Sequence, residues 1–111
     1  MSWKFACEKS AVEEEGMVEV EIDGATVLIV HSGGEFYAIP PACPHMEEPL
    51  KTGVCANRTI TCIKHLWQWN LDDGEPMGPA ETPIMKYETR TSDTAVEIFF
   101  EKELTYTYED S

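Results

Sequence analysis

The sequence predicts an all-β fold: an antiparallel β-sandwich that carries a smaller inserted subdomain. Short runs alternate apolar and polar side chains with the period of two that is typical of half-buried strands. Pairs of turn-forming residues separate these runs, as in β-hairpins. A proline-rich stretch begins at Pro40 and interrupts the pattern until about residue 84. We therefore expect one domain over residues 1–111, with a subdomain of about 41–84 inserted in a base of 1–40 and 85–111.

The first forty residues predict a strand followed by an antiparallel meander. Met17–Ile22 alternates apolar and acidic residues, and Asp23-Gly24 is a hairpin turn signal. Ser10–Glu15 is expected to form a short helical turn or an acidic loop. The expected strands are Trp3–Cys7, Met17–Ile22, Ala25–His31 and Glu35–Ile39, with a second turn at Ser32-Gly33-Gly34.

The second half predicts short strands in the insert and longer strands after it. In the insert we expect strands at Thr59–Cys62 and Trp67–Asn70, then a turn-rich loop over Asp72–Pro79. Regular strands are expected again at Met85–Thr91 and Ala95–Phe100. In the latter, Val96, Ile98 and Phe100 share one face, and Phe99 points the other way. Leu104, Tyr106 and Tyr108 alternate in the tail and suggest an additional edge strand.

The composition is that of a globular, strongly acidic protein. The 111 residues include 21 acidic and 8 basic side chains, which gives a formal net charge of −13. Such a surface repels phosphate backbones and anionic lipids, so nucleic acid and membrane are not expected partners. It favours basic protein surfaces and rapid encounters that depend on salt. No apolar run is long enough to span a membrane and no leader is recognisable, so we expect a soluble, cytoplasmic protein.

Two related motifs supply the chemistry: Cys43-Pro44-His45 and Cys62-Ile63-Lys64-His65, separated by residues 46–61. Two thiolates and two imidazoles can hold a [2Fe–2S] cluster with cysteines on one iron and histidines on the other. A Cys₂His₂ zinc site is an alternative, although zinc fingers pair Cys with Cys and His with His. Cys–His nucleophilic catalysis is a further alternative, but it would leave half of these four Cys and His residues unexplained. The other cysteines, Cys7 and Cys55, have no ligand-spaced neighbour and are expected to be buried thiols.

The motifs resemble those of the Rieske family, and the resemblance extends along the whole chain. Leu50 and Gly53 stand where the family often has Leu and Gly, and the run from Cys62 to Asn70 is similar to the Rieske ferredoxin of bacterial toluene monooxygenase systems. The resemblance implies that Cys43 and Cys62 bind one iron and His45 and His65 the other. It implies one cluster per chain, covered by a third loop at Pro79.

The same resemblance implies an electron carrier that is not itself an enzyme. An NADH-dependent flavin/iron–sulfur reductase would donate, and the hydroxylase of a diiron monooxygenase acting on an aromatic or other hydrocarbon would accept. We expect a monomer.

Only His31 remains beside the proposed ligands, so a mononuclear two-His-one-carboxylate iron site is not expected. Alternatives are the ferredoxin of a ring-hydroxylating dioxygenase, a small nitrite reductase subunit and, from another class, a structural zinc-binding protein.

Three expectations concern the surroundings of the site. One of Trp67 and Trp69 should lie in the core and the other at the surface. His31 should be a surface residue rather than a ligand. An acidic rim at the cluster end should steer docking of basic partners; its residues are Glu47, Glu48, Asp72, Asp73 and Glu75.

Overall fold

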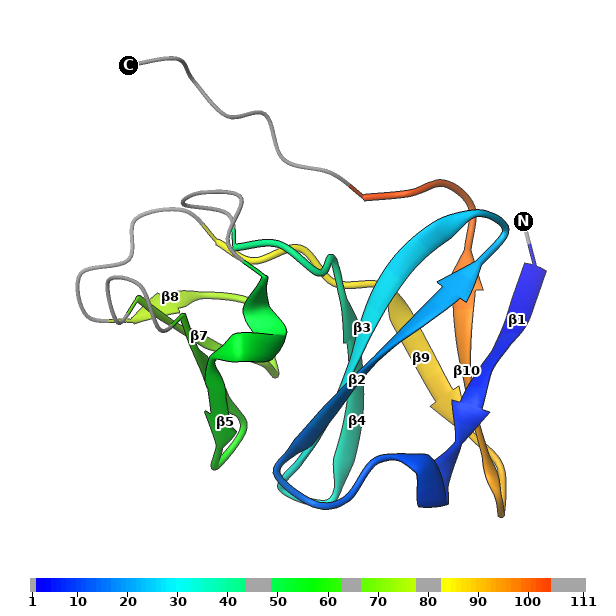
Figure 1. Cartoon of the computed structure of the whole chain (residues 1–111), viewed down its shortest axis with the longest axis horizontal. Coiled ribbons are helices and arrows are strands. Elements are labelled where there is room, and N and C mark those ends of the chain that lie inside the picture. The colour runs from blue at the N-terminus through cyan, green and yellow to red at the C-terminus, as the bar shows by residue number, and fades with distance from the viewer. Residues whose placement is uncertain (1, 44–48, 63–66, 78–82, 105–111) are drawn as a thin grey trace.

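The computed structural model describes residues 2–43, 49–62, 67–77 and 83–104, which form three antiparallel sheets (Figure 1). The first sheet has the order β1-β10-β9, the middle sheet β2-β3-β4, and the small sheet β5-β6-β7-β8. The strands are β1 (Ser2–Glu8), β2 (Gly16–Ile22), β3 (Ala25–Ser32), β4 (Glu35–Ile39), β5 (Val54–Ala56), β6 (Thr59–Thr61), β7 (Gln68–Asn70), β8 (Pro76–Met77), β9 (Glu88–Thr91) and β10 (Ala95–Phe100). Two short 3₁₀ helices, η1 (Lys9–Ala11) and η2 (Leu50–Thr52), precede β2 and β5.

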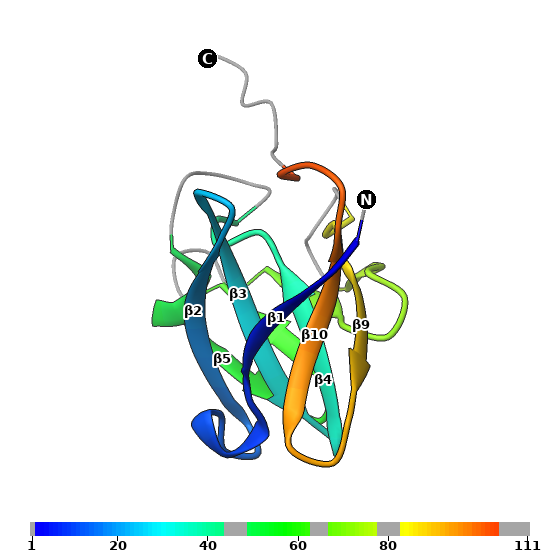
Figure 2. The same cartoon turned by 90° about the vertical axis from the view of Figure 1, so that its right-hand side faces the viewer.

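The middle sheet lies between the other two sheets (Figures 1 and 2). Successive side chains of a strand point to opposite faces. In β3, Val27 and Ile29 therefore pack in the hydrophobic cluster shared with the first sheet, whereas Leu28 and Val30 pack in a second cluster shared with the small sheet. All four are fully buried. Burial on both faces explains why Ala25–Val30 is a nearly continuous apolar run rather than an alternating one.

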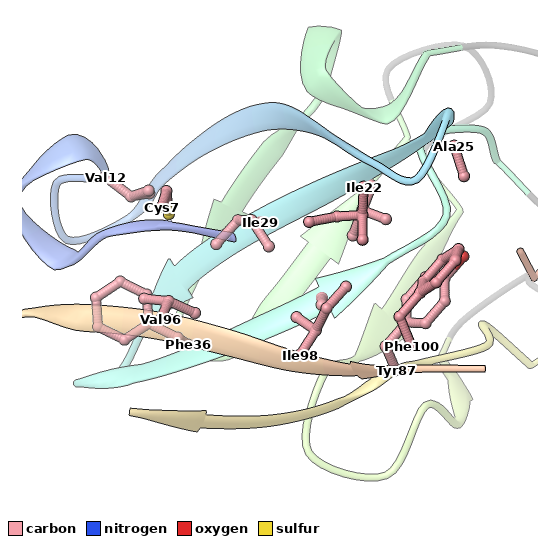
Figure 3. Packing of buried hydrophobic residues seen from close by; sticks show 12 residues of the cluster. Cys7, Val12, Ile22, Ala25, Ile29, Phe36, Tyr87, Val96, Ile98 and Phe100 are labelled. Atoms are coloured by element: carbon pink, nitrogen blue, oxygen red, sulfur yellow. The ribbon is translucent and has the colours of Figure 1, made fainter. Parts of the chain in front are cut away.

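The first cluster forms the core of the sandwich (Figure 3). Val96, Ile98 and Phe100 of β10 face Ile22 and Ile29 of the middle sheet across this core. Phe99 is half-buried on the opposite face, where its ring contacts Trp3 with 5.4 Å between centroids. The expected division of β10 into two faces is confirmed.

The two sandwich sheets also join directly at one side. The Tyr87 N–H donates to the Ala38 carbonyl at 2.8 Å, and Thr89 Oγ1 donates to the Phe36 carbonyl at 3.1 Å. Tyr87 thereby ties the segment before β9 to β4. These bonds satisfy backbone groups that would otherwise lie buried and unpaired.

The small sheet covers the other face of the middle sheet. Its inward residues, Cys55, Ile60 and Trp69, are buried in the second cluster beside Leu28 and Val30 of β3. All of its strands lie within the expected insert. The division of the chain into an inserted subdomain and a base stays a prediction.

The predicted β-architecture is confirmed, with differences in detail. The strands expected at Glu35–Ile39 and Ala95–Phe100 have the expected bounds, and the others in the base shift by a few residues. Strands β5 and β8 were not predicted, since three and two residues are too short to show a period. The first part of the expected Ser10–Glu15 turn lies in η1. Residues 101–104 form no strand, and Tyr106 and Tyr108 lie outside the described residues. No helix in the described segments is long and apolar enough to cross a membrane.

Truncation of Val30 should cost far more stability than truncation of Val54. Val30 is 0% exposed and Val54 is 61% exposed, and both lie in strands, so Val30→Ala and Val54→Ala differ mainly in burial. We expect Val30→Ala to lower the free energy of unfolding by about 2 kcal/mol, from lost burial and the cavity left behind. Val54→Ala should cost less than about 0.5 kcal/mol. Equal losses in chemical denaturation would contradict the two-sided burial of β3.

Candidate metal centre

The first predicted ligand loop is closed at its base by backbone pairing. Ala42 and Pro49 form an antiparallel bridge, and the Leu50 N–H donates to the Pro41 carbonyl at 2.9 Å. Cys43 follows Ala42 directly and is fully buried. Leu50, also fully buried, anchors the returning chain in the second hydrophobic cluster. The loop therefore leaves and re-enters the fold at fixed points.

The second predicted ligand loop is closed in the same way. The Cys62 N–H donates to the Trp67 carbonyl at 2.8 Å, directly beyond the paired strands β6 and β7. Cys62 is 1% exposed and belongs to the same cluster as Cys43. The structure thus brings the two cysteines of the separate motifs into one buried region.

The two predicted histidine ligands, His45 and His65, lie outside the described residues, as does Pro79 of the predicted third loop. Within the described part of the chain, no group of three or more possible ligands surrounds a common point. The two described cysteines fit an iron–sulfur group, because both are buried in one apolar cluster and none of the four cysteines forms a disulfide.

The tryptophans beside this region take the expected positions. Trp69 is fully buried in the second cluster, and Trp67 is half-buried against it, with 6.2 Å between the ring centroids. One indole is therefore core, and the other reaches the surface next to the loop closed by Cys62.

Cys7 and Cys55 are buried thiols, as expected. Burial, with a smaller contribution from the Glu15 and Glu14 carboxylates, raises the pKa of Cys55 to about 11. Burial also raises the pKa of Cys7. Both remain protonated near neutral pH and are therefore poor nucleophiles and poor metal ligands.

Gly53 allows close packing of the chain beneath the second loop. A Cβ at this position would lie 2.0 Å from the Thr61 carbonyl oxygen, one residue before Cys62. The backbone at Gly53 has φ −88°, so its requirement for glycine comes from space and not from conformation. From the sequence, only the family resemblance pointed to Gly53, and no local pattern indicated its close approach to Thr61.

The acidic segment before β2 connects two turns at the end of the fold remote from Cys62. Glu14 accepts hydrogen bonds from the Gly33 and Gly34 N–H groups, at 2.6 and 3.1 Å. Glu15 accepts from Ser32 Oγ at 3.0 Å and from the Asn57 N–H at 3.1 Å. These carboxylates therefore hold the β3–β4 turn and the β5–β6 turn together.

His31 belongs to this network and is not a plain surface residue. Its ring stacks on Phe36 at 4.0 Å between centroids, and Nδ1 lies 2.9 Å from the Val12 carbonyl oxygen. Nε2 lies 3.3 Å from a Glu14 carboxylate oxygen. The side chain is 18% exposed, because the segment from Val12 to Glu14 covers it.

A second set of polar contacts, centred on Asp72, fastens the small sheet to the middle sheet. Tyr37 of β4 donates to Asp72 Oδ1 at 2.5 Å, and Arg58 Nη1 lies 3.5 Å from Oδ2. Arg58 Nη2 also donates to the Gly33 carbonyl at 3.0 Å. Lys86 Nζ donates to the Leu71 carbonyl at 2.9 Å. Asp72 is thus a structural residue of the junction between sheets.

This position corrects the expected acidic rim. The Leu71 N–H pairs with the Arg58 carbonyl, so Asp72 lies beside the β5–β6 turn, at the opposite end of β6 from Cys62. Asp73 and Glu75 belong to the same β7–β8 turn. The two ligand loops lie at one end of the small sheet, and the β7–β8 turn lies at the other end. Asp72, Asp73 and Glu75 are therefore not beside the ligand loops. Glu47 and Glu48 lie outside the described residues.

Comparison with known proteins places these features in a family. The family model of the Rieske [2Fe-2S] domain matches residues 2–88. The methanesulfonate monooxygenase ferredoxin subunit of Methylosulfonomonas methylovora is 42% identical over 111 residues, which covers 99% of this chain and 90% of that protein.

Solved structures agree with this result. A chain from the complex of reduced oxygenase and oxidized ferredoxin in carbazole 1,9a-dioxygenase superposes with a TM-score of 0.80 and 26% identity, covering 93% of this chain and 97% of that chain. The ferredoxin of Sphingomonas yanoikuyae B1 superposes with a TM-score of 0.81 at 20% identity, over 90% of this chain and 100% of that chain, and therefore supports the fold.

Substitution of Gly53 should impair the site as well as the fold. In Gly53→Ala, the added methyl group must displace the β6 backbone that leads to Cys62, and we expect a loss of about 1–3 kcal/mol of stability. Iron bound per chain should also fall. Gly34→Ala is the control, since no atom lies within 4 Å of its added Cβ and its φ of +80° adds only conformational strain. Full iron content in Gly53→Ala would contradict this role of Gly53.

Removal of the Tyr37 hydroxyl should weaken the junction in a pH-dependent manner. The hydrogen bond from Tyr37 holds the pKa of Asp72 below its ordinary value. The contribution of the ionised carboxylate to stability is therefore present at neutral pH and is lost as the pH falls through the lowered pKa. Tyr37→Phe should lower the denaturation midpoint at pH 7, and its difference from the wild type should shrink at acid pH. A difference that is constant between pH 7 and 3 would contradict this assignment.

Proposed function

The chain belongs to the Rieske [2Fe–2S] family, and we propose that it carries single electrons to the oxygenase component of a multicomponent monooxygenase. The main support is the 42% identity, over nearly the full length of both proteins, to a monooxygenase ferredoxin subunit. The predicted Rieske resemblance and the predicted [2Fe–2S] cofactor are thereby confirmed. The protein is an electron-transfer component and not a catalyst of its own.

We further propose that Cys43 and Cys62 bind one iron and His45 and His65 the other, in one cluster per chain. Such a cluster, when bound, takes up and returns one electron, at a potential that the imidazole ligands raise above that of an all-cysteine cluster. The burial of both cysteines in one region supports Cys43 and Cys62 as ligands of one iron. The spacing of the two motifs supports His45 and His65 as ligands of the other iron.

The described residues around the two cysteines keep the inner end of this site apolar and fixed. Leu50, Ile60 and Trp69 are fully buried in the same cluster as the two cysteines, which makes the surroundings of the cysteines apolar. The backbone bonds at the base of each loop fix the position of its cysteine relative to the strands. A rigid, apolar site needs little rearrangement when the charge of its occupant changes, and this suits a carrier of electrons.

The proposed partners are an NADH-dependent flavin/iron–sulfur reductase, which donates, and the hydroxylase of the oxygenase, which accepts. The net charge of −13 supports protein partners with basic surfaces and disfavours nucleic acid and membranes. We propose a monomer in the cytoplasm, where cysteines without disulfides persist and reduced nicotinamide is available. The near-full-length relative favours a methanesulfonate-type oxygenase over the hydrocarbon monooxygenase expected from the sequence.

The ferredoxin of a ring-hydroxylating dioxygenase is the second candidate. It is supported by the superposition on a chain from the carbazole 1,9a-dioxygenase complex, although the 26% identity is lower. Reconstitution separates the two candidates. The holoprotein and an NADH-dependent reductase should support oxygen uptake with the methanesulfonate monooxygenase hydroxylase and much less with the carbazole dioxygenase oxygenase. The reverse preference would replace the first proposal with the second.

Ligand substitutions should abolish the cluster, and substitutions of the other cysteines should not. The anaerobically purified wild type should be red-brown and give a rhombic EPR signal of low average g after reduction by dithionite. We expect Cys43→Ser, Cys62→Ser, His45→Ala and His65→Ala to lose this signal. Cys7→Ser and Cys55→Ser are matched controls that should keep it, because both thiols are buried and protonated. A colourless wild type that contains zinc would support the structural zinc alternative instead.

A further inference from the structure

The outer face of the small sheet carries no charged side chain on its strands. Its residues form two rows across the sheet, and we call them together the neutral face: Val54, Thr61, Gln68 and Met77 in one row, and Ala56, Thr59 and Asn70 in the other. The alternate residues, Cys55, Ile60 and Trp69, are buried against the middle sheet. The neutral face therefore points away from the body of the protein.

The absence of charge on these strands contrasts with the other outward-facing strands. Charged side chains make up 26% of the chain. The outer positions of β9 and β10 carry Arg90 and Glu97, which form an ion pair at 2.7 Å, and β2 carries the exposed Glu21. The neutral face instead carries threonine, amide and apolar side chains, in a protein of net charge −13.

The neutral face also exposes apolar side chains at both of its edges. Within the described segments, the large hydrophobic residues that are exposed are Phe5, at 59%, Val54, at 61%, and Met77, at 39%. Val54 and Met77 lie at opposite edges of the same row. The polar groups between them are partly paired with each other, as Gln68 Nε2 donates to Thr61 Oγ1 at 3.1 Å. This hydrogen bond restrains the Gln68 side chain, and a side chain that is already restrained loses less entropy on binding.

The neutral face is continuous with the second ligand loop. Thr61 is followed by Cys62, Gln68 is preceded by Trp67, and the backbone bond between Cys62 and Trp67 closes the loop at this end of the sheet. The opposite end is the β7–β8 turn with Asp73 and Glu75. A protein that lies on this face therefore reaches the proposed cluster end on one side and an acidic turn on the other.

We propose that the neutral face is a docking surface for the oxygenase component, beside the proposed cluster. The proposal rests on the proposed function, because it identifies the occupant by the need for electrons to leave near Cys62. The complementary surface on the oxygenase is uncharged, with apolar side chains opposite Val54 and Met77 and hydrogen-bonding groups opposite the threonines. A charge held against this face would lose its hydration without gaining an opposite charge. Basic residues of the oxygenase lie beyond it, opposite Asp73 and Glu75, where the charges are complementary.

A matched pair of charge substitutions tests the proposal. Val54→Asp and Phe5→Asp each add one negative charge at a hydrophobic residue of nearly equal exposure, 61% and 59%, but only Val54 lies on the neutral face. Each holoprotein is titrated, with an NADH-dependent reductase, into the methanesulfonate monooxygenase hydroxylase. We expect Val54→Asp to raise the KM for the ferredoxin at least tenfold at unchanged kcat, and Phe5→Asp to change it less than twofold.

Further measurements separate docking from folding and from the choice of partner. The visible and EPR spectra of both variants should match the wild type, and Val54→Thr should restore the wild-type KM. Met77→Glu is a second variant at the other edge and should behave as Val54→Asp. Equal effects of Val54→Asp and Phe5→Asp, or an effect only on reduction by the reductase, would overturn the proposal while leaving the proposed function intact. A wild type that reduces neither this hydroxylase nor the carbazole dioxygenase oxygenase would overturn both.

Discussion

The two-sided burial of the middle sheet is the constraint on which the rest of the structure depends. β3 supplies Val27 and Ile29 to the sandwich core and Leu28 and Val30 to the core beneath the small sheet. A shift of its register by one residue would exchange the two sets and disrupt both cores at once. The cysteines of the proposed metal site lie in the second core, so their position depends on the same strand.

Polar contacts then fix the small sheet at the end remote from the proposed cluster. Glu15 and Arg58 connect its β5–β6 turn to Ser32 and Gly33, and Tyr37 holds Asp72 of its β7–β8 turn. At the other end, backbone pairs close the two ligand loops. The sheet is therefore held by charge and hydrogen bonding at one end and presents its loops at the other. This arrangement lets partners approach the loops without disturbing the junction.

The distribution of charge suits the proposed transfer of electrons between two protein partners. Glutamates on the sandwich strands and turns give the protein a long-range field that attracts basic surfaces. The strands beside the second ligand loop carry none of that charge. If the oxygenase docks on the neutral face as proposed, long-range attraction and short-range contact involve different parts of the surface. An encounter that is rapid but not overly tight needs this separation, because the complex must dissociate after each electron.

The sequence by itself determined the strands of the base and the ligand motifs, because both are local. Alternation with a period of two marks β2, and glycine turns bound the apolar runs of β3 and β4. The spacing of Cys43 with His45 and of Cys62 with His65 is equally local. Only the tertiary structure decided what depends on distant pairing. β5 and β8 exist because they pair with β6 and β7, and Asp72 became a junction residue through Tyr37, 35 positions away. The packing of Gly53 against Thr61 and the uncharged outer face likewise follow from sheet register, which no local pattern specifies.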